Sequence, residues 1–321
     1  MSELSFSAEA PNFLQSDVWA KTNRLIGHTV VESTLKNGQK LVMIVKNAKR
    51  ARYLEVPGGP LIDWQNSSEV AEAKAEMLKI ARGHHCAFVR FRPQLLDTPE
   101  NRKILGSIGA KKSPMHLAAE HTIIIDLTKS QEDLLANMRR QTRYEVRRAE
   151  KLGIKVKSGS SEELFKEFHK IQNETAARQH FVPPDLKTLL SEREAFGKNA
   201  KIYVAVTEDA PIAYGLILTH GDEAEYYEAA STDLNRKLPG AYALQWQVIK
   251  DLKKQGIKKY NLWGIAPAGQ KQHRYAGVTT FKTGFGGSIV TYVPAHDLII
   301  SKLKYAPDFL VETIRKKRRH L

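Results

Sequence analysis

The segment TTFKTGFGG, residues 279–287, joins a lysine to aromatic residues and several glycines. A cation held among apolar and glycine residues can stabilise the oxyanion that forms when a carbonyl becomes tetrahedral, so Lys282 is a candidate catalytic residue for acyl transfer. Gly284 and Gly286 allow a substrate to approach the backbone closely. A bulge at a sheet edge would use the glycines equally well, and a surface lysine with its ammonium in solvent would explain Lys282. The segment alone leaves both interpretations open.

A second group of candidates lies on one predicted helix, MRRQTRYEVRRAEKLG, residues 138–153. At 100° per residue, most of its cations fall within about half of the circumference and apolar side chains occupy the other half. We expect this helix to dock through its apolar side, to end at Gly153 and to leave a row of guanidinium groups outward. Such a row either binds phosphate or is a solvated surface, and the segment alone favours neither. The candidates for tRNA or phosphate binding are Arg139, Arg140, Arg143, Arg147 and Arg148.

Other chemistries have no support in the sequence. His84 and His85 are adjacent, no Cys or His pair recurs at metal-ligand spacing, and neither a Walker A sequence nor a G-x-S-x-G motif is present. The single cysteine, Cys86, lies in the apolar run CAFVRF and is expected to pack as a small buried hydrophobe. We therefore expect no metal and no cofactor.

The charge of the chain indicates an anionic partner. Its 321 residues carry 50 Lys and Arg against 35 Asp and Glu, a formal net charge of +15, which favours nucleic acid, an acidic membrane surface or a polyphosphate substrate. The length favours two domains. No secretory leader and no apolar run of the ~18 residues that span a membrane is visible, so the sequence predicts a cytoplasmic protein.

The order of predicted elements is repeated in the two halves. Each half has strands, a Pro-Gly turn (VPGGP and KLPGA), a long helix (67–82 and 240–255) and an apolar strand, which suggests a duplicated α+β unit. This order resembles the GNAT acetyltransferase fold, in which the turn before the helix holds a pyrophosphate. Neither turn has that fold's Arg/Gln-x-x-Gly-x-Gly/Ala pattern, although RKLPGA keeps an arginine.

Five motifs in order carry a more specific resemblance. They are MRRQTRYEVRRAEKLGI, ETAARQHFVPP, YYEAAS, NLWGIAP and FKTGFGG, and the opening FLQSDVWAKTN adds to them. Together they resemble the Fem family of aminoacyl-tRNA-dependent peptidoglycan transferases over nearly the whole chain. The resemblance implies an α+β fold of two tandem GNAT-like domains, 1–135 and 136–292, and a helical segment, 293–321, that packs back on the first domain. No heptad repeat follows residue 178, so the coiled-coil arm of some members is expected to be absent.

The resemblance also implies a function. An amino acid would pass from aminoacyl-tRNA to the stem-peptide amine of a peptidoglycan precursor, whether lipid-linked or UDP-linked. Lys282 would stabilise the oxyanion beside Phe281, Lys21 and Arg178 would bind the precursor's phosphates, and Tyr226 or Tyr227 its sugar or peptide. No general base is identifiable from the sequence.

Two other classes of function stay open. A coenzyme-A-dependent GNAT N-acyltransferase would share the fold but needs a phosphate-binding turn. A non-catalytic RNA- or membrane-binding protein would explain the charge but would leave FKTGFGG, expected inside a sheet, without a reason. The tail DFLVETIRKKRRHL, with consecutive cations at 315–319, suits peripheral contact with an anionic membrane, and a solvated terminus explains it equally well.

Overall fold

The chain consists of two compact units, each built from more than one segment. The computed structural model describes residues 12–208, 210–270, 273 and 275–318. Unit 1 comprises Met1–His121, Ala266–Arg274 and Val290–Leu321, and unit 2 comprises Thr122–Ile265 and Tyr275–Ile289. The division into 1–135, 136–292 and 293–321 remains a prediction, since compact units and domains need not share boundaries.

Unit 1 is a mixed sheet in the order β1-β2-β3-β4-β13-β5, in which β4 runs parallel to β3. Helix α2 packs its buried side on β3 and β4 through Val70, Ala73 and Met77, and the side chain of Asn66 caps its first turn. Cys86 is buried before β4, as expected. The elements of unit 1 are η1 (Phe13–Gln15), α1 (Asp17–Ile26), β1 (Thr29–Thr34), β2 (Lys40–Asn47), β3 (Arg52–Gly58), α2 (Ser67–Gly83), β4 (Phe88–Pro93), α3 (Pro99–Ser107), β5 (Lys111–Lys112), β13 (His296–Ile299) and α10 (Lys302–Arg318).

The glycine turn that follows β3 is filled by the chain itself. The side chain of Asn12 donates to Gly58 O at 2.7 Å, and Gln15 Nε2 donates to Pro57 O at 2.7 Å. A Cβ at Gly58 or Gly59 would collide with these two side chains. Glycine is therefore required here to admit residues of the same unit.

A buried ionic cluster joins β4, β13 and α10. Arg90 donates twice to Asp297, at 2.8 and 2.9 Å, and twice to Glu312, at 3.0 and 2.9 Å. Tyr305 OH also donates to Asp297, and the guanidinium lies over the rings of Tyr53 and Phe88. Because every charge is paired, the cluster can be buried and can fix the C-terminal helix on the sheet.

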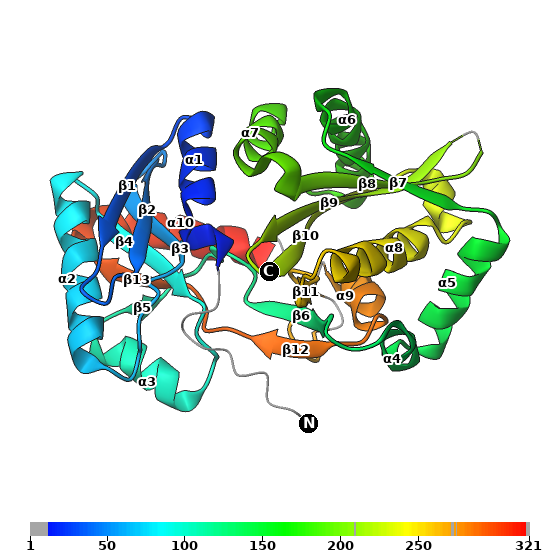
Figure 1. Cartoon of the computed structure of the whole chain (residues 1–321). Helices are drawn as coiled ribbons and strands as arrows, with labels where there is room; N and C mark the ends of the chain where they lie inside the picture. Colours follow the sequence, from blue (N-terminus) through cyan, green and yellow to red (C-terminus); the bar gives the residue numbers. More distant parts are fainter. Residues whose placement is uncertain (1–11, 209, 271–272, 274, 319–321) are drawn as a thin grey trace. The chain divides into compact units, whose positions relative to one another are not determined.

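Unit 2 is a second mixed sheet in the order β12-β6-β11-β10-β9-β8-β7. Helices α6 and α7 cover one face, and α8 lies against the other (Figure 1). The elements are β6 (His121–Asp126), α4 (Gln131–Asn137), α5 (Arg140–Lys151), β7 (Lys155–Gly159), α6 (Glu162–Gln179), α7 (Leu186–Phe196), η2 (Gly197–Asn199), β8 (Ala200–Val206), β9 (Pro211–His220), β10 (Glu223–Ser231), η3 (Asp233–Arg236), α8 (Gly240–Lys254), β11 (Lys259–Asn261), α9 (Ala276–Thr283) and β12 (Ser288–Thr291).

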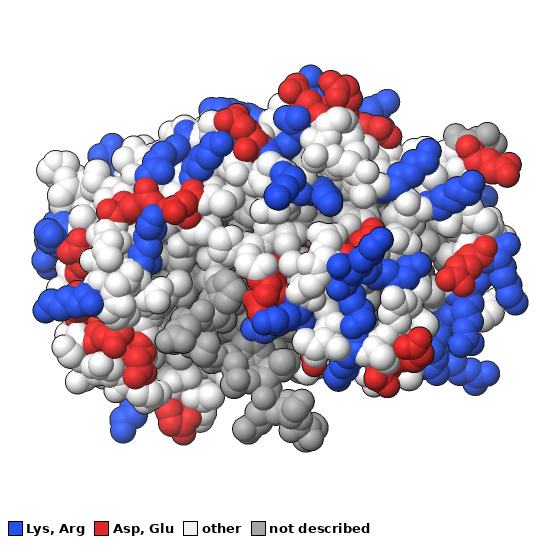
Figure 2. Space-filling view, in the orientation of Figure 1, with Lys and Arg blue, Asp and Glu red and all other residues white. Residues whose placement is uncertain are grey.

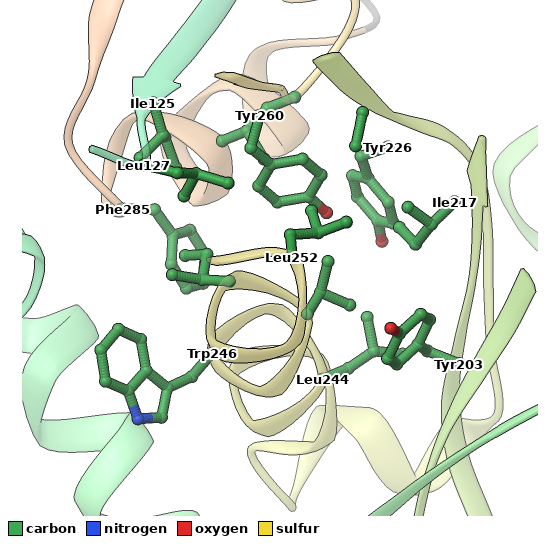
Figure 3. Close-up of a cluster of buried hydrophobic side chains, with 14 of the residues drawn as sticks. Ile125, Leu127, Tyr203, Ile217, Tyr226, Leu244, Trp246, Leu252, Tyr260 and Phe285 are labelled. Carbon is green, nitrogen blue, oxygen red and sulfur yellow. The ribbon is translucent and has the colours of Figure 1, made fainter. Parts of the chain in front are cut away.

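Hydrophobic burial beneath α8 holds unit 2 together. Leu244 and Leu252 of α8 are 1% exposed and lie among Tyr203, Ile217 and Tyr226 of the sheet (Figure 3). Each such side chain contributes about 1.5 to 3 kcal/mol when fully buried. The periodicity that predicts this helix therefore identifies its buried side correctly.

The two sheets repeat one order of strands, which supports the expected duplication. In each unit three antiparallel strands (β1-β2-β3 and β8-β9-β10) lead through a helix to a strand that runs parallel to the third. The final antiparallel neighbours, β13 and β6, come from distant parts of the chain. The expected α+β fold is confirmed.

The parallel pair of unit 2 is paired over a shorter length than that of unit 1. Strands β3 and β4 stay paired from Tyr53 to Gly58, whereas β10 and β11 pair only over Glu223–Glu225. A bulge at Tyr227 then shifts the register of β10 against β9. The C-terminal half of β10 therefore has no partner strand on its β11 side.

One expectation from the sequence is wrong at FKTGFGG. Phe281 and Lys282 lie in the last turn of α9 and not inside a sheet. The glycines that follow end this helix, and Gly286 and Gly287 have positive φ. A helix of eight residues with small and β-branched side chains gives little periodicity by which to predict it.

The cluster of Arg90 leads to a prediction about stability. Asp297→Asn removes the charge of a fully buried carboxylate while Arg90 keeps Glu312, so we expect the free energy of unfolding to fall by about 1.5 to 3 kcal/mol, the scale for lost hydrogen bonds between charged groups, measured by urea denaturation. Glu162→Gln is the matched control, because its partner Lys166 is exposed and its loss should leave the transition in place. Equal midpoints for the two variants would contradict this role of the cluster.

Candidate active site of unit 2

Lys282 is buried where β10 loses its partner strand. Its Nζ donates to Gly264 O at 2.8 Å and lies 5.8 Å from the centre of the Tyr226 ring. The side chain is 8% exposed although it carries an ammonium group. On α9 the neighbouring Phe281 packs against Tyr242 of α8 at 5.1 Å, which leaves Lys282 directed to the loop after β11. The apolar packing of the helix thus positions the amine.

The loop after β11 is shaped by a residue with left-handed backbone. Trp263 has φ +60°, and Asn261 accepts its N–H through Oδ1 at 2.9 Å. The side chain of Asn261 in turn donates to Glu223 at 3.0 Å. The turn brings the carbonyl of Gly264 to Lys282 and the Trp263 ring to Tyr227, 5.7 Å away and tilted by 61°.

Glu228 is the carboxylate that shares this region with Lys282. Gln172 of α6 donates to Glu228 Oε2 at 2.7 Å. Burial raises the pKa of Glu228 to about 7, although the hydrogen bond from Gln172 and the charge of Lys282 oppose the rise. Burial lowers the pKa of Lys282 to about 7, and the charge of Glu228 opposes that fall. Both groups therefore change charge close to neutral pH.

Two further carboxyl groups lie deeper in the same unit. Glu192 of α7 is 2% exposed and Glu225 of β10 is 4% exposed, and burial raises the pKa of both well above the usual range. One oxygen of each has no hydrogen-bond partner among the described residues. Nearby charge from Glu192, Glu228 and Glu225 raises the pKa of Tyr227 further, after burial. Burial therefore disfavours the charged form of both glutamates.

The sequence analysis does not predict these carboxyl groups. The motif YYEAAS draws attention to its tyrosines, and Glu192 lies in an ordinary amphipathic helix. The alternation in EAEYYEAAS does place glutamates on a buried strand, and it is the one signal that points to them. No group of three or more His, Cys, Asp or Glu in the described parts of the chain could hold a metal ion.

Several expected site residues lie close to Lys282. Tyr226 is beneath its ammonium, and Tyr227 is part of the Trp263 contact. Phe281 packs on Tyr242 and on Phe285. These contacts leave the expected catalytic and substrate-binding roles as predictions.

Packing within unit 2 requires glycine at two of the expected substrate-binding positions. A Cβ at Gly284 would collide with Thr142 and Arg139, and one at Gly286 would lie 2.9 Å from Asn137 O. Both positions therefore let the end of α9 lie against the start of α5. A contact between these glycines and a substrate remains a prediction.

The expected phosphate-binding residues lie in different units. Lys21 is exposed on α1 of unit 1. Arg178 ends α6 in unit 2, where it donates to Ser231 O at the end of β10 and lies 3.6 Å from Asp233. Arg178 is therefore held beside the strand that carries Glu228.

The arginines of α5 are less free than the sequence suggests. Arg139 donates to Thr280 O, Arg143 to Ala136 O and Arg148 to Lys237 O, and Arg148 also pairs with Glu145. Lys and Arg side chains gather at the right-hand edge of Figure 2, where Figure 1 places α5. The exposed members of the group that make no hydrogen bond or ion pair with another described residue are Arg140 and Arg147.

Comparisons with known proteins identify the family of the chain. A sequence model of the FemAB family matches residues 4–210 and 206–313. The aminoacyltransferase FemA of Staphylococcus aureus (strain MW2) is 22% identical, and the match covers 83% of this chain and 84% of FemA. No helix within the described ranges has the length and apolar content needed to cross a membrane.

Solved structures show what the fold is. A crystal structure of FemX has a TM-score of 0.82 at 16% identity, covering 95% of this chain and 96% of FemX. The C-terminal domain of a putative lysylphosphatidylglycerol synthetase from Agrobacterium fabrum has a TM-score of 0.60 at 13% identity, covering 92% of both chains. A tandem GNAT protein from the clavulanic acid pathway has a TM-score of 0.53 at 12% identity, covering 85% and 83%. The fold is thus two tandem GNAT-like domains.

The coiled-coil arm is absent from the described residues, as expected. Helix α6 ends at Gln179, and α7 is a separate helix of 11 residues. The family model extends over both units and over nearly the whole chain. The chain therefore belongs to the FemAB family and is a transferase.

Proposed function

We propose that the protein transfers an amino acid from aminoacyl-tRNA to the stem-peptide amine of a peptidoglycan precursor, and that unit 2 carries the reaction. The observation that carries the proposal is Lys282, a buried ammonium that lies between Gly264 O and the Tyr226 ring. FemA is named as an aminoacyltransferase, and family membership makes acyl transfer the natural reaction for such a cation. A strongly shifted lysine in a polar cluster is typical of a functional site.

The reaction mainly requires that the two substrates are oriented and that the oxyanion is stabilised. The acceptor amine attacks the ester carbonyl of the charged tRNA, and the ribose hydroxyl leaves. Lys282 as a cation would stabilise the oxyanion of the tetrahedral intermediate, worth roughly 2.7 to 4 kcal/mol for one donor. Holding the two reactants in line could supply on the order of 7 to 11 kcal/mol more, without a catalytic triad.

The coenzyme A alternative has less support in either unit. In unit 2, the first amides of α8 are already bonded: Gly240 N to Leu238 O and Ala241 N to Asn235 Oδ1 at 3.0 Å, and Pro239 has no N–H. In unit 1, Asn12 and Gln15 occupy the glycine turn after β3. A pyrophosphate needs free amides at such a helix start.

A purely binding function also fits the interior poorly. A protein that only binds RNA or lipid gains nothing from burying Lys282, Glu228 and two further carboxyl groups, because burying each of them costs desolvation free energy. Such costs persist where chemistry uses the shifted groups.

The two substrates require separate anion-binding surfaces. Arg140 and Arg147 are exposed on α5 and are the best placed of the expected cations to contact tRNA phosphates. Arg178, beside the end of β10, is better placed for the precursor's diphosphate. The basic end of α10 is proposed to contact an acidic membrane surface, since Leu310 and Ile314 are exposed beside its cations.

A direct assay tests the proposed function. Purified protein is incubated with a pool of radiolabelled aminoacyl-tRNAs and with either the UDP-linked or the lipid-linked precursor, and the product is identified by mass. A precursor heavier by one amino-acid residue is the expected product. No mass gain in any combination, together with acetyl transfer from acetyl-coenzyme A, would favour the alternative.

The role of Lys282 gives the first prediction for this reaction. Lys282→Ala should lower turnover by roughly 2.7 to 4 kcal/mol, the scale for one lost oxyanion donor, while binding of the precursor changes little. Single-turnover rates and calorimetry measure the two effects. Lys250→Ala is the control. Lys250 lies over Trp246 on α8 and has no proposed role in the reaction, so its loss should leave the rate unchanged. A wild-type rate for Lys282→Ala would remove the residue from the active site.

The position of Arg178 gives a second prediction. Arg178→Ala should weaken precursor binding by about 1.5 to 3 kcal/mol, because a charge-assisted bond to phosphate is lost. Arg236→Ala is a matched control, since Arg236 approaches the same Asp233 at 3.7 Å but is 75% exposed. Equal affinities for the two variants in calorimetry would count against a phosphate contact by Arg178.

The end of α10 gives a third prediction. The protein should sediment with vesicles that contain acidic lipid at low salt and be released at high salt, because cations near such a surface add about 1 kcal/mol each. Deleting residues 315–321 should abolish most of this binding and spare activity on the UDP-linked precursor. If the truncated and intact proteins sediment alike, the tail is not a membrane contact.

A further inference from the structure

We infer that Glu228 accepts the proton of the incoming amine, an assignment that rests on the proposed function and gives unit 2 the general base that its sequence does not reveal. The carboxyl group lies directly after the bulge at Tyr227, on the half of β10 that has lost its β11 neighbour. Gln172 Nε2 donates to Oε2 at 2.7 Å, and Oε1 makes no hydrogen bond with another described residue. One oxygen is thus held and the other is available.

Access separates Glu228 from its neighbours. Glu192, Glu223 and Glu225 are at most 4% exposed, whereas Glu228 is half-buried. Gln172, which orients it, is 0% exposed and cannot move freely. A substrate amine can therefore approach Glu228 more readily than any other carboxyl group of this region, and it would find that group in a fixed orientation.

The surrounding charges suit a base at neutral pH. Among the described residues, three titratable groups interact with Glu228: Glu192 from α7, Tyr227 from β10 itself and Lys282 from α9. Burial disfavours the charged forms of Glu192 and Tyr227, because it raises the pKa of each well above its usual value. Glu228, with a pKa raised to about 7, can both take up and release a proton at neutral pH.

The proton balance of aminoacyl transfer calls for such a group. The acceptor enters as an ammonium ion, and Glu228 takes one proton to leave a neutral amine. The amine nitrogen then forms a bond to the ester carbon, and Lys282 stabilises the oxyanion. As the carbon–oxygen bond to the ribose breaks, the second proton from nitrogen passes to the leaving oxygen. Glu228 returns its proton to water, so one proton is released per amide formed.

The two residues give opposite pH dependences. Glu228 must be deprotonated, so its limb of the rate profile rises as pH increases through about 7. Lys282 must be protonated, so its limb falls as pH increases through about 7. The rate profile is therefore bell-shaped with a maximum near neutral pH.

The closing experiment measures kcat/KM against pH for wild type and Glu228→Gln. The amide keeps the shape of the side chain and can still accept the bond from Gln172, so the fold should persist. We expect kcat/KM to fall by about 100-fold to 10,000-fold at pH 7 and the rising limb to disappear. The control is Glu174→Gln, the same change on the exposed side of α6, which should match wild type. A rising limb retained in Glu228→Gln would overturn the assignment.

A second variant separates the base from a merely structural role. Gln172→Met removes the hydrogen bond that lowers the pKa of Glu228, so the rising limb should move to higher pH and the maximum should fall, while the rates well above pH 7 stay close to wild type. An unmoved limb would overturn the assignment. The infrared difference spectrum between wild type and Glu228→Gln can be titrated without substrate. The absence of a carboxyl band that titrates near pH 7 would also overturn the assignment. A titrating band with no product from any substrate pair would instead refute the proposed function.

Discussion

The candidate site depends on the early separation of two parallel strands. Strands β10 and β11 stay paired only to Glu225, and the part of β10 that follows carries Tyr226, Tyr227 and Glu228. The loop after β11 turns through Trp263, which has a left-handed backbone, and offers the carbonyl of Gly264 to Lys282. A sheet cannot leave buried backbone groups without partners, so the side chains of α9 and α6 become part of the structure at this point. In unit 1, β3 and β4 stay paired to Gly58, and the glycine turn is filled by Asn12 and Gln15.

This arrangement is stabilised against a considerable electrostatic cost. The pKa of Lys282 falls from 10.5 to about 7, which corresponds to roughly 4 to 5 kcal/mol against the charged form. Burial also disfavours the charged form of Glu228, which raises the pKa of that group instead of lowering it. The apolar contacts of α8 beneath the sheet are large enough to hold the strands while these groups stay partly desolvated. The rigid core therefore supports groups whose pKa values are shifted by burial, which is typical of a functional site.

The sequence predicts the local elements far better than their partners. Apolar periodicity identifies α2 and α8 with their buried sides, and Lys282 is recognisable among its glycines. The pairing of β13 with unit 1 and of β6 with unit 2 is not predictable in the same way, because it joins residues far apart in the chain. The arginines of α5 illustrate a second limit. Helical spacing places Arg139, Arg143 and Arg148 outward, but backbone carbonyls on other segments accept hydrogen bonds from them. Glu192 and Glu228 show a third, since a pKa depends on burial that only the folded chain creates.

The charges of the protein are divided between surface and interior. The net charge of +15 comes from side chains such as Arg140 and Arg147, which face water, whereas the interior of unit 2 holds more carboxyl groups than ammonium groups. Phosphates are large, strongly hydrated anions that are bound well at an exposed basic surface. An amine that must lose a proton needs the opposite: a desolvated carboxylate whose pKa is close to that of the surroundings. A protein that joins a polyanionic carrier to an amine would need both environments in one molecule: exposed arginines for the anion and a desolvated carboxyl group for the amine.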